Sequence, residues 1–296
     1  MNPMGAGNQT GSPAGYASGL SVIAIWSGFI VFSRLGVTGN LTAFDMTALR
    51  FMVGGLITLP FVAGHWPRQL SIPKILFLAA VGPGAGYSVL MFIGLDAAPA
   101  AYAGVFANGT LPIFTALIGL VWIGERLGTL ATLGIAVIFA GGVAVGYNGL
   151  IAGGFDALAG VAFFLTASAT LAVYVVLVRR WQVTPKQTLC AINIPTALIF
   201  IPVWWFFLPT NLAGATSQEI AFQALFQGFG PSFLAVLLMT YAVHEIGPTK
   251  MAAFAATVPT TAALLAIPVL GEHLGTVEWT GVIVVTAGLL LLLWKR

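Results

Sequence analysis

Ten long apolar segments follow one another along this chain, with only short polar loops between them. Each is about 20 residues long, which is the length a helix needs to cross the ~30 Å hydrocarbon core of a bilayer. Only 6% of the residues are charged, against about 25% in soluble domains, so the folded surface could not remain in water. The sequence therefore predicts an all-α membrane protein with spans at 18–37, 43–64, 72–95, 99–123, 128–147, 156–178, 187–208, 217–243, 249–270 and 276–294.

Residues 110–141 are repeated at 257–288, with 13 of the 32 aligned positions identical. Each half of the chain contains five spans. Because five is an odd number, the second half must enter the membrane in the opposite sense to the first, as in transporters built from inverted repeats. We therefore predict a disordered tail at 1–17 and two inverted five-helix repeats, 18–147 and 156–294, which enclose a central cavity.

Glycine and proline interrupt the spans at matching places in the two halves. A proline inside a helix removes a backbone hydrogen bond, and the freed carbonyl then needs a partner or a water-lined cavity. A single proline is most often a packing kink, but matched interruptions indicate a transport site and its pivots. The first half has Gly82, Pro83 and Pro112, and the second half has Gly230, Pro231 and Pro259.

Aromatic and amide side chains lie deep within several spans. Exposing a polar group to lipid is unfavourable, and binding pockets are mostly apolar with a few placed polar groups. For any single aromatic residue, packing against the core or the lipid is the simpler alternative. We expect the substrate-binding residues to be Trp26, Tyr87, Tyr102, Asn108, Gln227, Tyr241 and Phe254.

Charged residues are rare within the spans, but Arg50 lies about two turns into the second span, five residues after Asp45. An arginine or aspartate at a helix centre is unfavourable by about 2.5–3.5 kcal/mol on insertion scales. One interpretation is a local ion pair or extension of the side chain to the outer interface. The other is a gate charge that meets a substrate carboxylate. Glu125 and Glu272 are expected to cap the starts of the fifth and tenth spans.

The missing residue types narrow the function. The interiors of the first and sixth spans hold no carboxylate, which disfavours a cation-drug antiporter. The spans also lack a mid-membrane pair of lysines or arginines, which disfavours a phosphate or nucleotide-sugar carrier. The lining suits a neutral or zwitterionic molecule with an apolar or aromatic group. The single cysteine, Cys190, cannot form a metal set, and we expect no cofactor and no nucleic-acid surface.

Basic residues are divided unequally between the two sets of loops. If the amino terminus is cytosolic, at most Arg34 and Arg50 lie on the far side. The positive-inside bias then places both termini in the cytosol. The cytosolic set is Arg68, Lys74, Arg126, Arg179, Arg180, Lys186, Lys250, Lys295 and Arg296.

The motif Gly124-Glu125-Arg126-Leu127 after Pro112, copied as Gly271-Glu272-His273-Leu274 after Pro259, resembles the drug/metabolite transporter superfamily and its EamA-type ten-helix exporters. The likeness covers about residues 18–294, and within the family the chain is similar to bacterial aromatic amino acid exporters of the YddG type. The resemblance implies a monomeric exporter of the bacterial inner membrane. It also implies that spans one, three, four, six, eight and nine line the cavity, that two and seven gate it, and that five and ten brace the outside.

These observations lead us to expect an alternating-access carrier, and no enzyme, that exports a small-molecule substrate through the lipid bilayer. Amino acids with aromatic or bulky neutral side chains, and related amphipathic metabolites, fit the uncharged interior. Carriers of other cargo, such as drugs, sugars or polyamines, remain open as alternatives. A passive channel has less support, and an intramembrane enzyme would need a polar catalytic cluster that the spans lack.

Overall fold

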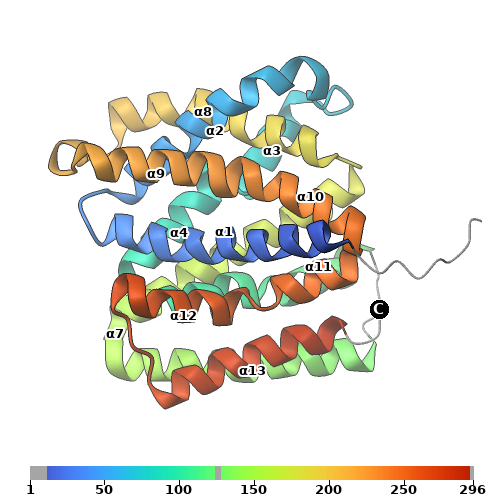
Figure 1. The fold of residues 1–296 in the computed structure, drawn as a ribbon, viewed down its shortest axis with the longest axis vertical. Helices are drawn as coiled ribbons and strands as arrows, with labels where there is room; N and C mark the ends of the chain where they lie inside the picture. The colour runs from blue at the N-terminus through green and yellow to red at the C-terminus, as the bar shows by residue number, and fades with distance from the viewer. Residues whose placement is uncertain (1–11, 124–127, 294–296) are drawn as a thin grey trace, which may run out of the picture.

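The computed structural model describes residues 12–123 and 128–293. All regular structure in this part of the chain is helical, and it contains ten helices long and apolar enough to cross a membrane. The helices form a roughly antiparallel bundle in which Ser12 and Leu293, the described ends, lie at the same edge (Figure 1). This arrangement confirms the predicted fold class of a ten-span, all-α membrane protein.

The first half contains five spans, the fifth of which is the first part of a longer segment described below. Its third and fourth spans are each built from more than one helical piece, and the fourth includes a π-helical turn. The elements are α1 (Pro13–Val37), α2 (Ala43–His65), α3 (Ile72–Val81), α4 (Ala85–Ala97), α5 (Ala100–Ala103), η1 (Gly104–Gly109) and α6 (Leu111–Ile123).

The first helix begins at Pro13, earlier than the predicted start at residue 18. The Ser12 hydroxyl oxygen accepts a hydrogen bond from the Gly15 amide at 3.1 Å and caps the helix. Proline is well suited to the first helical position because its missing N–H would have no partner there. The predicted disordered tail was therefore too long, and residues 1–11 lie outside the described part of the chain.

The segment α7 (Thr129–Arg180) spans the junction between the two halves as two helices that meet at Gly154. It turns sharply at Gly154, whose φ of 64° lies in the left-handed region that glycine adopts readily. The turn divides α7 into two membrane spans, Thr129–Tyr147 and Gly154–Arg180. A short loop was predicted here, and the structure replaces it with helix on both sides of one glycine.

The second half repeats the pattern of the first. Its eighth and ninth spans are again built from several pieces, with a π-helical turn in the eighth. The elements are α8 (Pro185–Phe207), the short 3-10 turn η2 (Leu212–Gly214), α9 (Ser217–Phe229), η3 (Gly230–Leu234), α10 (Ala235–Ile246), α11 (Pro248–Ala255), α12 (Val258–Leu270) and α13 (Thr276–Leu293).

The helices are interrupted at the matching positions. Gly82 and Pro83 lie in the gap between α3 and α4, whereas Pro231 lies in the π-helical η3. Pro112 and Pro259 are each the second residue of a new helix, so neither breaks a backbone hydrogen bond. The chain therefore breaks just before these two prolines instead of kinking at them.

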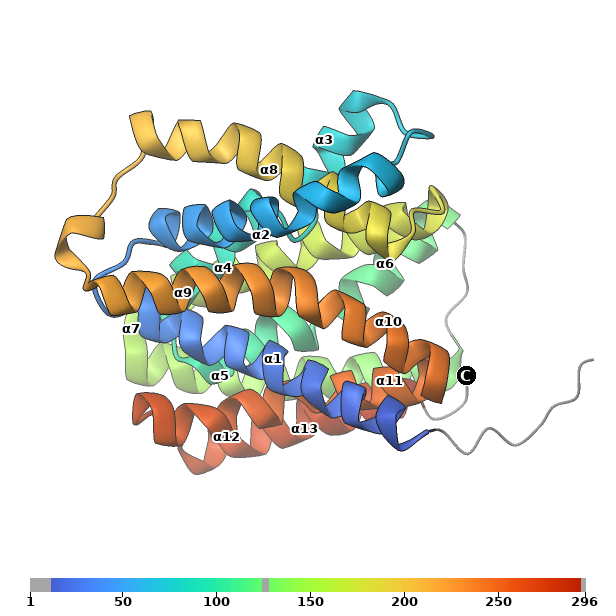
Figure 2. The ribbon, with the colours of Figure 1, turned by 45° about the horizontal axis from the view of Figure 1, so that its top comes forward.

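The helices α7 and α13 lie side by side along one face of the bundle, opposite α2 and α8 (Figures 1 and 2). A Cβ atom on Gly141 would lie 2.8 Å from the Gly281 carbonyl oxygen, and one on Gly134 would lie 3.0 Å from that of Gly288. Gly281 is the sequence copy of Gly134, and Gly288 is that of Gly141. A reciprocal contact of this form is what a two-fold axis between the halves generates.

Candidate functional site

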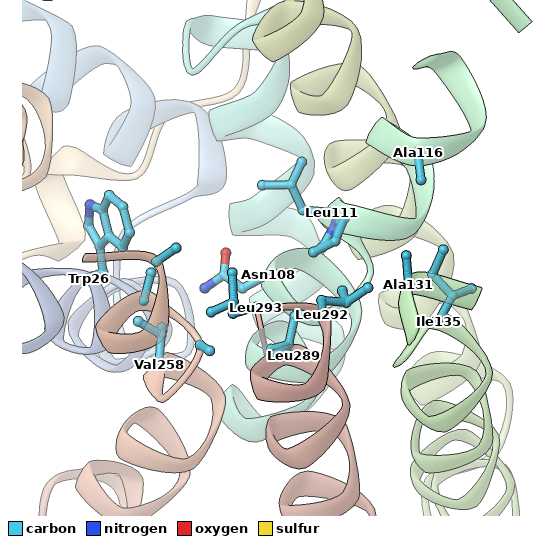
Figure 3. Close-up of a pocket in the computed structure, with 14 residues that line it drawn as sticks. Trp26, Asn108, Leu111, Ala116, Ala131, Ile135, Val258, Leu289, Leu292 and Leu293 are labelled. Atoms are coloured by element: carbon cyan, nitrogen blue, oxygen red, sulfur yellow. The ribbon is translucent and has the colours of Figure 1, made fainter. Parts of the chain in front are cut away.

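A cavity of about 310 Å³ lies in the half of the bundle that holds the described chain ends. Its wall comes from α1, η1, α6, the start of α7, α11, α12 and the end of α13. Figure 3 shows the lining side chains converging on this space. They are Trp26, Asn108, Leu111, Pro112, Ala116, Ala131, Ile135, Ala252, Ala255, Ala256, Val258, Leu289, Leu292 and Leu293.

Trp26 and Asn108 bring hydrogen-bonding groups to this wall. Asn108 lies in the π-helical η1, just before the break that precedes α6. Its side chain points into the space between Trp26 and the leucines of α13 (Figure 3). Neither the Asn108 amide nor the Trp26 indole N–H is hydrogen-bonded to a described residue, so both remain available to a ligand.

The rest of the wall is apolar, and alanines at 252, 255 and 256 keep it open. None of the described lining residues is charged. Small-molecule sites usually occupy about 300–1,000 Å³, so this cavity suits a compact metabolite. The arrangement can orient a polar group at Asn108 and Trp26 while it buries an apolar group against alanine and leucine.

Five of the seven predicted binding residues do not line this cavity. Tyr102 is buried and donates a hydrogen bond to Glu278 at 2.8 Å. Gln227 is buried and donates to the Ser33 hydroxyl at 3.0 Å. The sequence does not show which way a side chain faces, and the Tyr102 hydroxyl and the Gln227 amide nitrogen donate to partners within the fold.

The other three predicted binding residues face the membrane or pack against other side chains. Tyr241 is 45% exposed on α10, where a membrane would cover it. Phe254 packs edge-to-face against Tyr16, with their ring centroids 6.2 Å apart. Tyr87 is buried on α4, in the same core cluster as Phe29. Trp26 and Asn108 are therefore the predicted pair that the structure brings together.

The cavity wall also differs from the wall that the family resemblance implied. Spans five and ten, expected to brace the outside, supply Ala131, Ile135 and the leucines at 289, 292 and 293. Spans three, six and eight supply none of the described lining residues. These alanines and leucines carry no polar signal in the sequence. Only the alanine-rich stretch 252–256, just before the break at Pro259, could have indicated them.

In the opposite half of the bundle, Arg34 on α1 forms an ion pair with Glu272 after α12, here called the distal ion pair. Arg34 also donates to the carbonyl oxygens of Leu95 and Asp96 at the end of α4. Glu272 accepts a hydrogen bond from the Ala100 amide at 2.9 Å, at the start of span four. Elements from both repeats are thus joined on the side away from the cavity.

The predicted capping role of Glu272 was wrong, because Glu278 accepts the hydrogen bond from the Gly275 amide before α13, at 2.6 Å. Glu272 instead satisfies the first amide of a different span. The corresponding expectation for Glu125, and the motif 124–127, lie outside the described residues.

Asp45 and Arg50 do not form an ion pair, which corrects the first interpretation of these charges. Asp45 is fully buried and accepts hydrogen bonds from the Trp204 indole at 3.0 Å, the Thr210 hydroxyl at 2.6 Å and the Asn211 amide at 2.9 Å. It therefore fastens the start of α2 to the segment after α8. Arg50 is 4% exposed, so its side chain does not extend to an interface either.

Comparisons with known proteins agree with this architecture. Residues 13–147 and 158–294 each match the EamA-like transporter family. The chain is 25% identical over 292 residues to the uncharacterized transporter YwfM of Bacillus subtilis (strain 168), covering 90% of this chain and 93% of the relative. A crystal structure with 22% sequence identity has the same fold, with a TM-score of 0.64, covering 94% of this chain and 95% of the other.

Proposed function

Since this chain belongs to the EamA-like transporter family, within the drug/metabolite transporter superfamily, we propose that it exports amino acids and related amphipathic metabolites by alternating access. Substrates with aromatic or bulky neutral side groups fit best. The observation that carries this proposal is the uncharged cavity, in which Trp26 and Asn108 offer unpaired hydrogen-bonding groups on an apolar wall. A zwitterionic or neutral molecule with one apolar end matches that distribution.

The position of the cavity supports the proposed direction. It lies toward the chain ends, while the distal ion pair holds the opposite side together. The positive-inside bias favours both termini in the cytosol of a bacterium. In the inner membrane, this state would then bind substrate from the cytosolic side. The matched breaks before α6 and α12 would serve as pivots for the exchange of access. We expect a monomer to suffice, because the cavity is formed within one chain.

The proposed class of substrate is more specific than the family and the relative indicate. The relative YwfM is described only as a transporter, and membership of the EamA-like family does not specify a substrate. The aromatic amino acid preference therefore rests on the shape and polarity of the cavity, together with the resemblance to exporters of that kind. Drugs, sugars and polyamines are the competing cargo, and a passive channel is the competing mechanism.

Efflux from proteoliposomes tests the proposal. Vesicles that contain the purified protein and labelled Phe, Trp, Thr or Met should lose label faster than protein-free vesicles, with a rate that saturates. Trp26→Ala and Asn108→Ala should each reduce the initial rate about tenfold, because each removes a polar contact to the substrate in a desolvated site.

Trp205→Ala is the matched control, because Trp205 is 66% exposed and lies outside the cavity. This variant should retain the wild-type rate. Absence of efflux for every amino acid would contradict the proposed cargo, and a rate proportional to concentration without saturation would indicate a channel. Inhibition of efflux by unlabelled sugars or polyamines, and not by amino acids, would favour the other cargo classes.

A further inference from the structure

Arg50 on α2 is a buried cation without a polar partner. Its side chain is 4% exposed, and its Nε and Nη1 atoms are both buried with no hydrogen-bond acceptor in the described part of the chain. An uncompensated charge in a low-dielectric interior is strongly unfavourable, and buried polar groups without partners are uncommon enough to require a reason. A ligand that supplies the acceptor would be such a reason.

The surroundings of Arg50 are aromatic. Its guanidinium carbon lies 5.0 Å from the ring centroid of Phe29 on α1 and 5.5 Å from that of Phe51 on its own helix. Tyr87 on α4 is buried in the same core cluster as Phe29. Cation–π contacts stabilise such a charge in part, but they leave the N–H groups of Nε and Nη1 without acceptors.

The nearest acid in the sequence does not serve as partner. Asp45 lies more than one turn earlier on α2 and accepts hydrogen bonds from Thr42, Trp204, Thr210 and Asn211. Glu272, the carboxylate of the part-buried distal ion pair, is bound by Arg34. Both carboxylates are therefore already paired, and no hydrogen bond joins a described acceptor to Arg50 Nε or Nη1.

Arg50 lies between the cavity and the distal ion pair. The Arg50 guanidinium lies over the ring of Phe29. Phe29 is three residues after the cavity residue Trp26 and five before Arg34. At 1.5 Å per residue along a helix, Phe29 is about one turn beyond Trp26 toward the distal ion pair, and Arg50 lies over its ring. A substrate that crosses from the cavity to the distal side would pass its level.

Two buried hydroxyl groups on the same stretches of α1 and α4 also lack partners. Ser27 is two residues before Phe29, and Ser88 follows Tyr87 directly. Both are fully buried, and neither hydroxyl has a hydrogen-bond partner among the described residues. Each is a free hydroxyl donor of the kind that binds a carboxylate.

The geometry points to Arg50 as the subsite that binds the carboxylate of the transported molecule. This inference rests on the proposed function, and it narrows the substrates to carboxylate-bearing amphipathic metabolites, zwitterionic amino acids among them. The guanidinium fork pairs with both carboxylate oxygens, while the apolar end of the molecule stays against the cavity wall. Molecules of the same shape without a carboxylate would leave the buried charge unpaired and bind more weakly.

Binding of three related probes to the purified wild-type protein tests the subsite without any substitution. Phenylalanine and phenylacetate carry a carboxylate, whereas phenethylamine keeps the ring and the ammonium group but lacks it. We expect the first two to raise the thermal unfolding midpoint and to bind at least about tenfold more tightly than phenethylamine. Equal binding of all three probes would overturn the inference.

Arg50→Met gives the second measurement, because methionine keeps much of the side-chain length and removes the charge. Phenylalanine affinity should fall about tenfold or more, to the level of phenethylamine, while phenethylamine affinity stays unchanged. The unfolding midpoint without ligand should hold or rise, since an unpaired buried charge is removed. Arg68→Met, at an exposed loop position, is the matched control and should bind all probes as the wild type does.

The outcomes separate the two proposals. If wild-type vesicles release phenylalanine and the Arg50→Met protein binds and releases it equally well, the carboxylate subsite is wrong and the exporter proposal stands. If wild-type protein neither binds nor releases any amino acid, the proposed cargo is wrong and the subsite falls with it. Should Arg50→Met fail to fold, the wild-type comparison of the three probes still decides the question.

Discussion

Asp45 joins two distant parts of the chain through both of its carboxylate oxygens. Oδ1 accepts hydrogen bonds from the Trp204 indole and the Thr210 hydroxyl, and Oδ2 accepts from the backbone amides of Thr42 and Asn211. The side chain is fully buried. A carboxylate bonded in this way contributes far more to stability than an exposed one, because its donors would otherwise be buried without acceptors.

Asp45→Ala should therefore lower the free energy of unfolding by about 2–4 kcal/mol. The measurement is thermal unfolding of the purified protein in detergent, followed by circular dichroism. Asp156→Ala removes an exposed aspartate on α7 and should change the unfolding midpoint little. Equal effects of the two substitutions would show that the Asp45 network does not hold α2 to the segment after α8.

The sequence did not show which of the predicted polar side chains are hydrogen-bonded within the fold. Gln227 and Tyr102 are buried, but their partners, Ser33 and Glu278, come from other spans. Trp26 and Asn108 line the cavity, and the indole N–H and the side-chain amide have no such partner among the described residues. Whether a deep polar group is paired or available depends on contacts between helices, which no local pattern encodes.

The pairing of α7 with α13 depends on glycines that let the two backbones approach closely, as small residues do in membrane helices. A Cβ atom on Gly281 would lie 2.4 Å from Cγ2 of Val145 and 2.8 Å from the Gly141 carbonyl oxygen. Because one of these neighbours is backbone, a methyl group can be accommodated only if the helices separate.

We expect Gly281→Ala to lower the thermal unfolding midpoint, with a loss of about 1–3 kcal/mol from overpacking. Gly64→Ala is the matched control, because a Cβ atom at Gly64 in α2 meets nothing within 4 Å. Alanine is the better helix former by about 1 kcal/mol, so this control should leave the midpoint unchanged or raise it. A Gly281→Ala protein as stable as the control would contradict the close-contact role of this pair.

Element-level features were partly readable from the sequence. Thr42 with Asp45 and Thr184 with Gln187 form capping boxes at the starts of α2 and α8, the second span of each half. The breaks at matching glycines and prolines are also present. Their form was not predictable, because a π-helical turn such as η1 or η3 and the sharp turn at Gly154 are set by how neighbouring helices pack around them.

For the whole molecule, the distal ion pair joins the first repeat to the second on the side away from the cavity. Arg34 lies on α1, and Glu272 precedes α13 and also binds the first amide of α5. If access alternates, these contacts must separate when the distal side opens. Each one therefore favours the present state over the alternative.

Glu272→Gln should shift the population toward distal opening. In a Cys190→Ser background, a single cysteine placed at Ala101, which is 1% exposed on α5, reports the opening through its rate of maleimide labelling. Loss of a charge-assisted contact of about 1.5 kcal/mol should raise that rate roughly tenfold. Asp156→Asn alters an exposed carboxylate on α7 and should leave the rate unchanged. An unchanged rate in Glu272→Gln would exclude the gating role.

The sequence by itself determined the membrane class, the number of spans, the five-plus-five division and the places where the helices break. Those features follow from segment length, apolar content and the repeat, which are local or periodic properties. Only the tertiary structure decided which faces meet, which polar groups remain unpaired, and that spans five and ten form part of the cavity wall. The reason is that these helices are apolar on nearly every side, so no amphipathic stripe marks the face that points inward.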